Sequence, residues 1–151
     1  MMEIEKEKIV YRHATIEDVP ALVNYRIQFL NEHFNHPEDN ATKVLRDSLT
    51  EYFARAIPSR HFIAWVAEYE GKIIATSGMV VWQKPAIYEG VESGKLGYLL
   101  NFYTVSEARR KGIGTRLLNE LIKEAKSLGL KYLHLHASKD GIGYLQKSRI
   151  C

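Results

Sequence analysis

The seven residues from 109 to 115, Arg-Arg-Lys-Gly-Ile-Gly-Thr, combine the residue types that can hold a diphosphate. The two glycines let the backbone approach a ligand closely, and three cations precede them. The run follows the apolar segment 96–105 and leads into a helical pattern that starts near Ile113. The first amides of a helix have no partner within it, and they carry partial positive charge. The run therefore predicts a phosphate-binding turn, although a tight strand-to-helix connection with solvated cations uses the same residue types.

The elements that must position this turn follow from hydrophobic periodicity. We expect strands at 9–12, 62–69, 72–83, 95–105 and 131–137, helices at 18–30, 42–57 and 114–128, and one or two helical turns within 140–147. The helix 114–128 buries a stripe of apolar residues: Leu117, Leu118, Leu121, Ile122, Ala125 and Leu128. Gly129 ends that helix, and Glu70-Gly71 forms a tight hairpin turn.

The order of these elements predicts the class of fold. Three strands joined without helices, from 62 to 105, favour antiparallel pairing. The later strand-helix-strand crossover requires a parallel pair of strands. We therefore expect an α/β (α+β) fold: one mixed, mostly antiparallel sheet with helices on both faces, in a single domain over residues 1–151.

Three kinds of phosphate-binding loop compete for the glycine turn. A Walker A loop needs a lysine and then a hydroxyl residue after its last glycine, whereas Thr115 and Arg116 follow Gly114. A dinucleotide-binding fingerprint needs a third glycine where Leu117 stands, and it needs a long parallel sheet. Both therefore fail, and the pattern that remains is Arg-x-x-Gly-x-Gly after an apolar strand.

Composition excludes several other classes of protein. The 151 residues carry a net charge of +3, and cations concentrate only at 109–111, so we expect no nucleic-acid partner. No apolar run approaches the ~20 residues of a membrane span, so we expect no membrane association. The single cysteine, Cys151, allows no internal disulfide and lacks the surroundings of a catalytic thiol. These features favour a cytoplasmic protein.

In this context the chain resembles the GNAT superfamily of acyl-CoA-dependent N-acyltransferases. The family pattern Q/R-x-x-G-x-G/A is matched by Arg109, Gly112 and Gly114, and the order of strands and helices matches over nearly the whole chain. The resemblance implies that the strands before and after the glycine-turn helix are parallel and splayed. It also implies transfer of an acetyl group from acetyl-CoA to a primary amine, directly within a ternary complex and without a metal. The acceptor is then a small-molecule amine or a peptide.

The resemblance also assigns the residues that bind the co-substrate. The amides of the turn would hold the pyrophosphate of coenzyme A, and the backbone of the preceding strand would pair with the pantetheine arm. One such amide could also polarise the thioester carbonyl. The cofactor-binding residues expected on this basis are Phe102, Tyr103, Thr104, Arg109, Arg110, Lys111, Gly112, Ile113, Gly114 and Thr115.

The catalytic groups are less sharply defined. Tyr144 matches a family tyrosine on the last helix, which is proposed as general acid toward the thiolate; an aromatic packing role is the alternative. Glu68 is a candidate base, or a solvated carboxylate at the end of a strand. Asn101 is a candidate for orienting the substrate or a water, or else a satisfied core amide. His134 and His136 share a face of their strand, but no third ligand lies nearby in sequence, so we expect no metal.

Each of several other residues has two candidate roles. Trp65, Trp82, Tyr98 and Tyr103 are strand aromatics that either pack in the core or line a pocket. Glu89 and Glu92 either attract a cationic amine or form a solvated acidic loop.

The C-terminal region departs from the family pattern. Ser148 and Arg149 stand where a glycine-aromatic pair is usual, Ala137 where an asparagine is common, and the sequence reaches only Cys151. We expect the last two strands of the family to be missing, which would expose a sheet edge that a second subunit could cover as a homodimer. The leading hypothesis is an N-acetyltransferase. A CoA-binding module with little catalysis and a nucleotide-binding regulatory domain are the alternatives.

Overall fold

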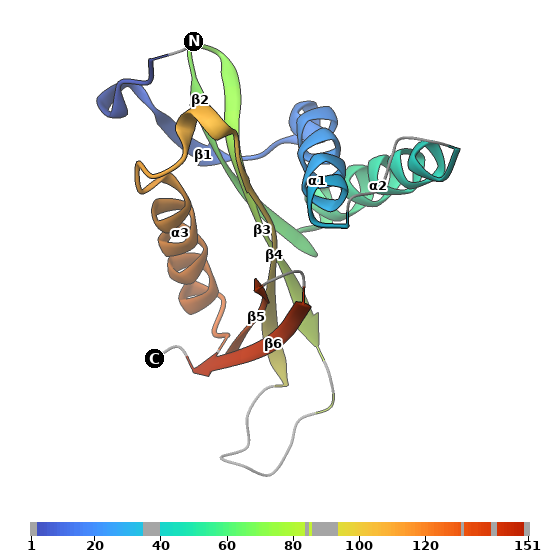
Figure 1. The fold of residues 1–151 in the computed structure, drawn as a ribbon. Coiled ribbons are helices and arrows are strands. Elements are labelled where there is room, and N and C mark those ends of the chain that lie inside the picture. The colour runs from blue at the N-terminus through green and yellow to red at the C-terminus, as the bar shows by residue number, and fades with distance from the viewer. Residues whose placement is uncertain are drawn as a thin grey trace.

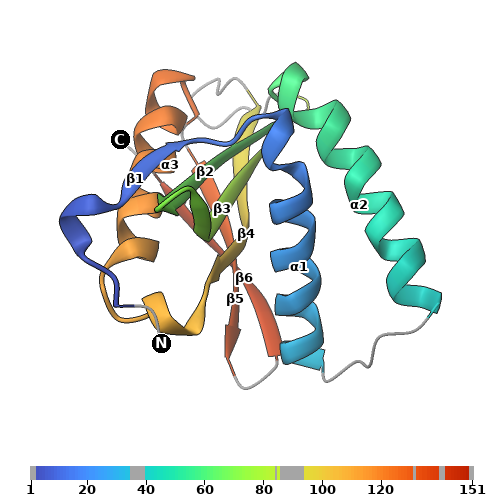
Figure 2. The same cartoon turned by 90° about the horizontal axis from the view of Figure 1, so that it is seen from above.

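The computed structural model describes residues 3–34, 40–83, 85, 94–130, 132–139 and 142–149. Within them a six-stranded sheet separates helices α1 and α2 on one face from α3 on the other (Figures 1 and 2). The strands are β1 (Val10–His13), β2 (Phe62–Tyr69), β3 (Lys72–Gln83), β4 (Lys95–Thr104), β5 (Tyr132–Lys139) and β6 (Ile142–Arg149); the helices are α1 (Val19–Phe34), α2 (Asn40–Ser59) and α3 (Ile113–Ser127). Short 3-10 turns lie at Lys6–Lys8, Ile16–Asp18 and Ser106–Ala108.

The sheet follows the chain, in the order β1-β2-β3-β4-β5-β6. Every neighbouring pair is antiparallel except β4 and β5, which are parallel and joined through α3. The mixed α/β class and the parallel pair are therefore confirmed. The turn between β2 and β3 has positive φ at Glu70 (50°) and Gly71 (77°), as a two-residue type I′ hairpin turn requires.

Each face of the sheet buries its own apolar layer. Beneath α1 and α2 the layer is built from Leu22, Val23, Ile27, Phe53 and Phe62. Gly78 is required here, because an added Cβ would lie 2.2 Å from the Phe62 ring. Beneath α3 the buried residues recur every fourth position, at Ile113, Leu117, Leu121 and Ala125, as an amphipathic helix requires.

The structure corrects the sequence-based prediction at Leu128 and at the segment 140–147. Leu128 was expected in the buried stripe of α3, but it is 39% exposed, because α3 ends at Ser127 and Leu128 lies in the turn beyond it. The segment 140–147 was expected to be helical, but residues Ile142–Arg149 form β6. All eight residues of β6 pair with β5, whereas a helix of one or two turns is marginal without strong packing. One strand thus follows β5 where the resemblance placed a helix.

No helix within the described ranges combines the length and the apolar character needed to cross a bilayer.

The carboxylate of Glu124, on α3, contacts side chains of β1, of the turn before β2, and of β2. The Trp65 indole Nε1 donates to Glu124 Oε1 at 2.7 Å, the Arg60 Nη2 lies 3.1 Å from Oε2, and His13 Nε2 contacts Oε1. Burial by itself would raise the pKa of Glu124, but the hydrogen bonds from His13 and Trp65 outweigh it and hold the pKa below its ordinary value of 4.5. The ionised carboxylate therefore stabilises the folded protein.

We expect Glu124→Ala to lower the free energy of unfolding by about 1–3 kcal/mol at pH 7, because it leaves the Trp65 donor and the Arg60 cation unpaired. The Glu124 contribution is complete above the unfolded-state pKa and is lost as the pH falls through the lowered folded-state pKa. The difference between the two proteins should therefore shrink in acid, as measured by urea unfolding at several pH values. Glu51→Ala, which removes an exposed pair with Arg55, is the control and should change stability by less than about 0.5 kcal/mol. Equal losses from both variants would contradict this assignment.

Candidate active site

Strands β4 and β5 separate part-way along their length. Their parallel pairing covers only Gly97 with Leu133, Tyr98 with His134 and Leu99 with Leu135. Beyond Leu99 and Leu135, β4 continues to Thr104 and β5 to Lys139 without pairing to each other. We call the space between these unpaired halves the gap. The β4 residues 100–104 thus carry backbone groups that β5 does not use.

A β-bulge in β4 lies at the root of the gap. The register with β3 shifts between Thr76 and Gly78, so that Asn101 and Phe102 together face the single residue Ser77. Asn101 adopts φ +65°, and the Thr76 hydroxyl donates to the Asn101 carbonyl oxygen at 3.0 Å. Because a bulge bends its strand and increases the local twist, this one turns the second half of β4 away from β5.

The glycine turn follows the open end of β4. Arg110 and Gly112 have φ of 65° and 78°, and Gly112 precedes the first residue of α3. The Arg116 amide donates to the Gly112 carbonyl oxygen at 3.0 Å, so the amides of residues 113–115 precede the helical ladder. The left-handed conformation at Gly112 explains why glycine stands there.

Most residues of the glycine turn are exposed to solvent. Arg109, Arg110, Gly112, Gly114 and Thr115 are exposed, and Lys111 is half-buried. A Cβ added at Gly112 or Gly114 would have no protein atom within 4 Å. Ile113 differs, because its side chain is 2% exposed and packs in the core, so only its backbone could meet a ligand.

A pocket of about 400 Å³ connects the end of β4 with the turn. It contains five of the expected cofactor residues, namely Phe102, Tyr103, Thr104, Arg109 and Gly114. Its other wall comes from α1 and β3, through Phe29, Glu32, His33 and Thr76. The α1 residues were not among those predicted from the sequence. Their spacing at 29, 32 and 33 places them on one helical face, but the predicted helix ends at residue 30, whereas α1 continues to Phe34.

Three polar residues of this pocket, Glu32, Tyr103 and Arg109, interact with one another. Tyr103 Oη donates to Glu32 Oε1 at 2.8 Å, and the Arg109 guanidinium lies 5.4 Å from the centre of the Tyr103 ring. Arg109 Nε donates to the Thr104 carbonyl oxygen at 2.8 Å. Burial, and then the hydrogen bond to Glu32, raise the pKa of Tyr103 to about 12. Tyr103 therefore stays neutral at physiological pH.

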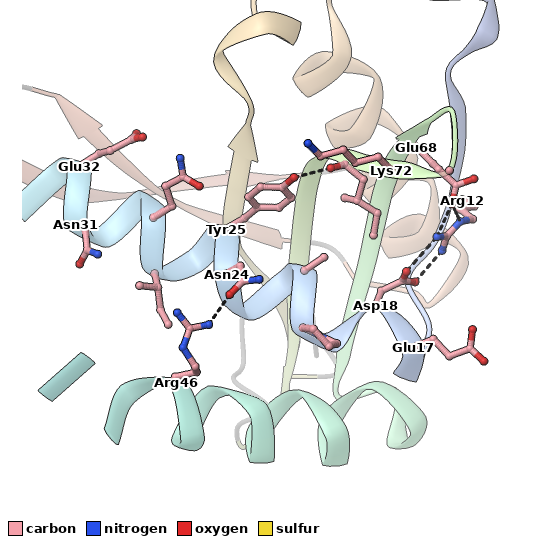
Figure 3. A pocket seen from close by; sticks show the side chains of 16 residues that line it. Arg12, Glu17, Asp18, Asn24, Tyr25, Asn31, Glu32, Arg46, Glu68 and Lys72 are labelled. Atoms are coloured by element: carbon pink, nitrogen blue, oxygen red, sulfur yellow. Dashed lines mark hydrogen bonds and ion pairs between the residues drawn. The ribbon is translucent and has the colours of Figure 1, made fainter. Parts of the chain in front are cut away.

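A larger pocket of about 1040 Å³ lies between α1, α2 and the β2–β3 hairpin (Figure 3). It holds Glu68, whose Oε1 lies 2.8 Å from Arg12 Nη2. Arg12 also binds Asp18, at 2.7 Å. Glu68 is thus a partner of a cation, and this pocket contains no residue of the glycine turn or of β4. Size alone does not make it the candidate site, because the smaller pocket adjoins the gap and the turn.

The other expected residues are placed as follows. Tyr144 lies on β6 opposite Ala137 of β5, two residues beyond the last β4–β5 pair, rather than on a helix. Trp65 packs on His13, with ring centres 4.3 Å apart, on the Glu124 side of the sheet. Trp82 is 59% exposed and touches Tyr98 edge-on.

Two of the alternatives involve possible ligand side chains. Within the described chain, no three His, Cys, Asp or Glu side chains gather closely enough to hold a metal. His134 lies on β5 in register with Tyr98, whereas the side chain of His136 lies outside the described part, as do Glu89 and Glu92 entirely. Asn101 is 7% exposed, and no described residue provides a hydrogen-bond partner for its carboxamide.

Comparison with known proteins decides the family. The model of the acetyltransferase (GNAT) family matches residues 24–147. The chain belongs to the GNAT acetyltransferase family. A search among curated proteins gave no match.

Solved structures agree with this assignment. A predicted acetyltransferase from Clostridium acetobutylicum, solved with acetyl-CoA, is 32% identical, with a TM-score of 0.77 over 88% of this chain and 83% of that one. A GCN5-related N-acetyltransferase from Ralstonia eutropha JMP134 shares the fold, with 24% identity, a TM-score of 0.77 and coverage of 88% and 86%. A ribosomal-protein-alanine N-acetyltransferase from Brucella melitensis is 26% identical, with a TM-score of 0.61 and coverage of 83% and 72%. The protein is thus a GNAT-family acetyltransferase.

Proposed function

We propose that this GNAT acetyltransferase transfers the acetyl group of acetyl-CoA to a primary amine within a ternary complex. The observation that carries the proposal is the gap between β4 and β5, which opens beside an exposed glycine turn. A linear ligand with a diphosphate at one end fits this pair of features. The relative from Clostridium acetobutylicum, solved with acetyl-CoA, supports the same choice of co-substrate.

The chain offers two sets of groups for coenzyme A. The amides of residues 110–115 would hold the pyrophosphate, because they lie at a helix start where Arg110, Gly112, Gly114 and Thr115 are exposed. Arg109, Arg110 and Lys111 add positive charge. The unpaired backbone of Phe102, Tyr103 and Thr104 would pair with the amides of the pantetheine arm, as an added strand would. The turn has room for a pyrophosphate, since Gly112 and Gly114 leave open space where side chains would obstruct an anion.

The proposed reaction needs no covalent enzyme intermediate. The nitrogen of a neutral amine attacks the thioester carbonyl, the new C–N bond forms, and the C–S bond breaks to release the thiolate of coenzyme A. A backbone amide in the gap stabilises the charge that develops on the carbonyl oxygen. Tyr144 donates a proton to the thiolate, and a water or a carboxylate takes the proton from the amine. Glu68 is a weak candidate for that base, because its carboxylate binds Arg12.

Gly114→Glu tests the phosphate-binding turn. A carboxylate at this position in the first turn of α3 suits the helix dipole, so thermal stability should be kept or raised. The same carboxylate repels a pyrophosphate, so we expect the dissociation constant for coenzyme A to rise by about a hundredfold or more in calorimetry.

Asn119→Glu, on the exposed side of the same helix, adds the same charge as a control and should leave the affinity unchanged. Undiminished binding by Gly114→Glu would exclude the turn as the phosphate site.

Tyr144→Phe tests the proposed acid. We expect turnover to fall by about a hundredfold, because a general acid contributes about that much, while the KM for acetyl-CoA changes little. The measurement is release of free thiol from acetyl-CoA with a panel of amines: amino acids, polyamines, aminoglycosides and peptides. Tyr52→Phe, at an aromatic contact of α2, is the control and should retain full turnover. A Tyr144→Phe enzyme with the normal rate would remove Tyr144 from the mechanism, and tight binding with no turnover on any amine would favour a binding module.

A further inference from the structure

Asn101 combines two unfavourable features at one position. Its backbone has φ +65°, a conformation that residues other than glycine rarely adopt, although asparagine tolerates it best. Its side chain is buried, with 7% exposure, yet neither Nδ2 nor Oδ1 has a hydrogen-bond partner in the described part of the chain. Buried amides are almost always hydrogen-bonded, so an unpartnered one calls for an explanation.

The position of Asn101 supplies that explanation. Asn101 follows Leu99, the last residue of β4 that pairs with β5, by two places, so it lies where the gap begins. Phe102, Tyr103 and Thr104 come next, and they lead toward the glycine turn. A ligand that runs from the turn along β4 reaches Asn101 with the end farthest from its diphosphate.

The backbone at Asn101 is held in place independently of the side chain. The Thr76 hydroxyl donates to the Asn101 carbonyl oxygen, in a buried hydrogen bond of 3.0 Å. The bulge opposite Ser77 fixes the register on both sides. The carboxamide is therefore not needed to hold the bulge together, and it is left with one acceptor and two donor positions for another molecule.

We propose that the Asn101 carboxamide binds the thioester end of acetyl-CoA, by hydrogen bonds to its polar atoms at the root of the gap. This inference rests on the proposed function and adds a specific side chain to it. Asn101 thereby positions the acetyl group, whereas the turn holds the phosphates.

Asn101→Gly is the most direct variant, because glycine adopts φ +65° without strain and removes the carboxamide. We expect its affinity for acetyl-CoA to fall at least tenfold in calorimetry. Its affinity for 3′-phosphoadenosine 5′-diphosphate, which lacks the pantetheine arm and the thioester, should equal that of the natural protein. Asn101→Asp keeps the size of the side chain and tolerates the same backbone, but it cannot donate from an NH₂ group. Asn101→Asp therefore controls for a packing defect, and we expect it also to bind acetyl-CoA more weakly than the natural protein.

The outcomes of these measurements distinguish a failure of this inference from a failure of the proposed function on which it rests. Unchanged acetyl-CoA affinity in folded Asn101→Gly and Asn101→Asp would overturn the role of Asn101 and leave the proposed function standing. An equal loss of affinity for acetyl-CoA and for 3′-phosphoadenosine 5′-diphosphate would also overturn it, because the substitution would then have altered the glycine turn as well. If the natural protein bound neither ligand, the proposed function would fail and this inference with it.

Discussion

The separation of β4 from β5 is the constraint on which the rest of the site depends. Parallel strands normally stay paired over their shared length, and unpaired backbone inside a sheet is unfavourable. Here the pairing stops at Leu99 and Leu135, and the bulge at Asn101 and Phe102 bends β4 at that point. The backbone groups left without a strand partner are those that an extended, amide-containing ligand can use.

The glycine turn is placed by the same strand. β4 ends at Thr104, a short 3-10 turn follows at Ser106–Ala108, and α3 begins at Ile113. The buried side chains of Ala108 and Ile113 fix this connection to the core, while the residues between them stay exposed apart from half-buried Lys111. A rigid base with an exposed backbone suits anion binding, because the amides are oriented before the ligand arrives. The proposed site for coenzyme A thus consists of two stretches of backbone that follow each other in the chain.

Much of this arrangement could be predicted from the sequence. Strands β2 and β3 have the predicted bounds, because each is a largely apolar run bounded by turn residues. Helix α3 starts within one residue of its prediction, because its four-residue apolar periodicity is strong. Helix α2 reaches Ser59 instead of stopping before Pro58. The segment 142–149 was misread because its pairing partner, β5, is not visible in local periodicity. The bulge at Asn101 and the α1 wall with Glu32 were not predictable for the same reason, since both depend on contacts between distant segments.

An amide-resolved NMR titration of the ¹⁵N-labelled protein with coenzyme A tests the proposed binding along β4 and the glycine turn. Binding there predicts large shift changes for the amides of residues 102–104 and 110–115, on both sides of the short turn that joins β4 to α3. It also predicts small changes in the larger pocket, at Asn24, Gln28 and Lys72. Changes confined to the larger pocket, with the amides of 102–104 and 110–115 unmoved at saturation, would contradict it.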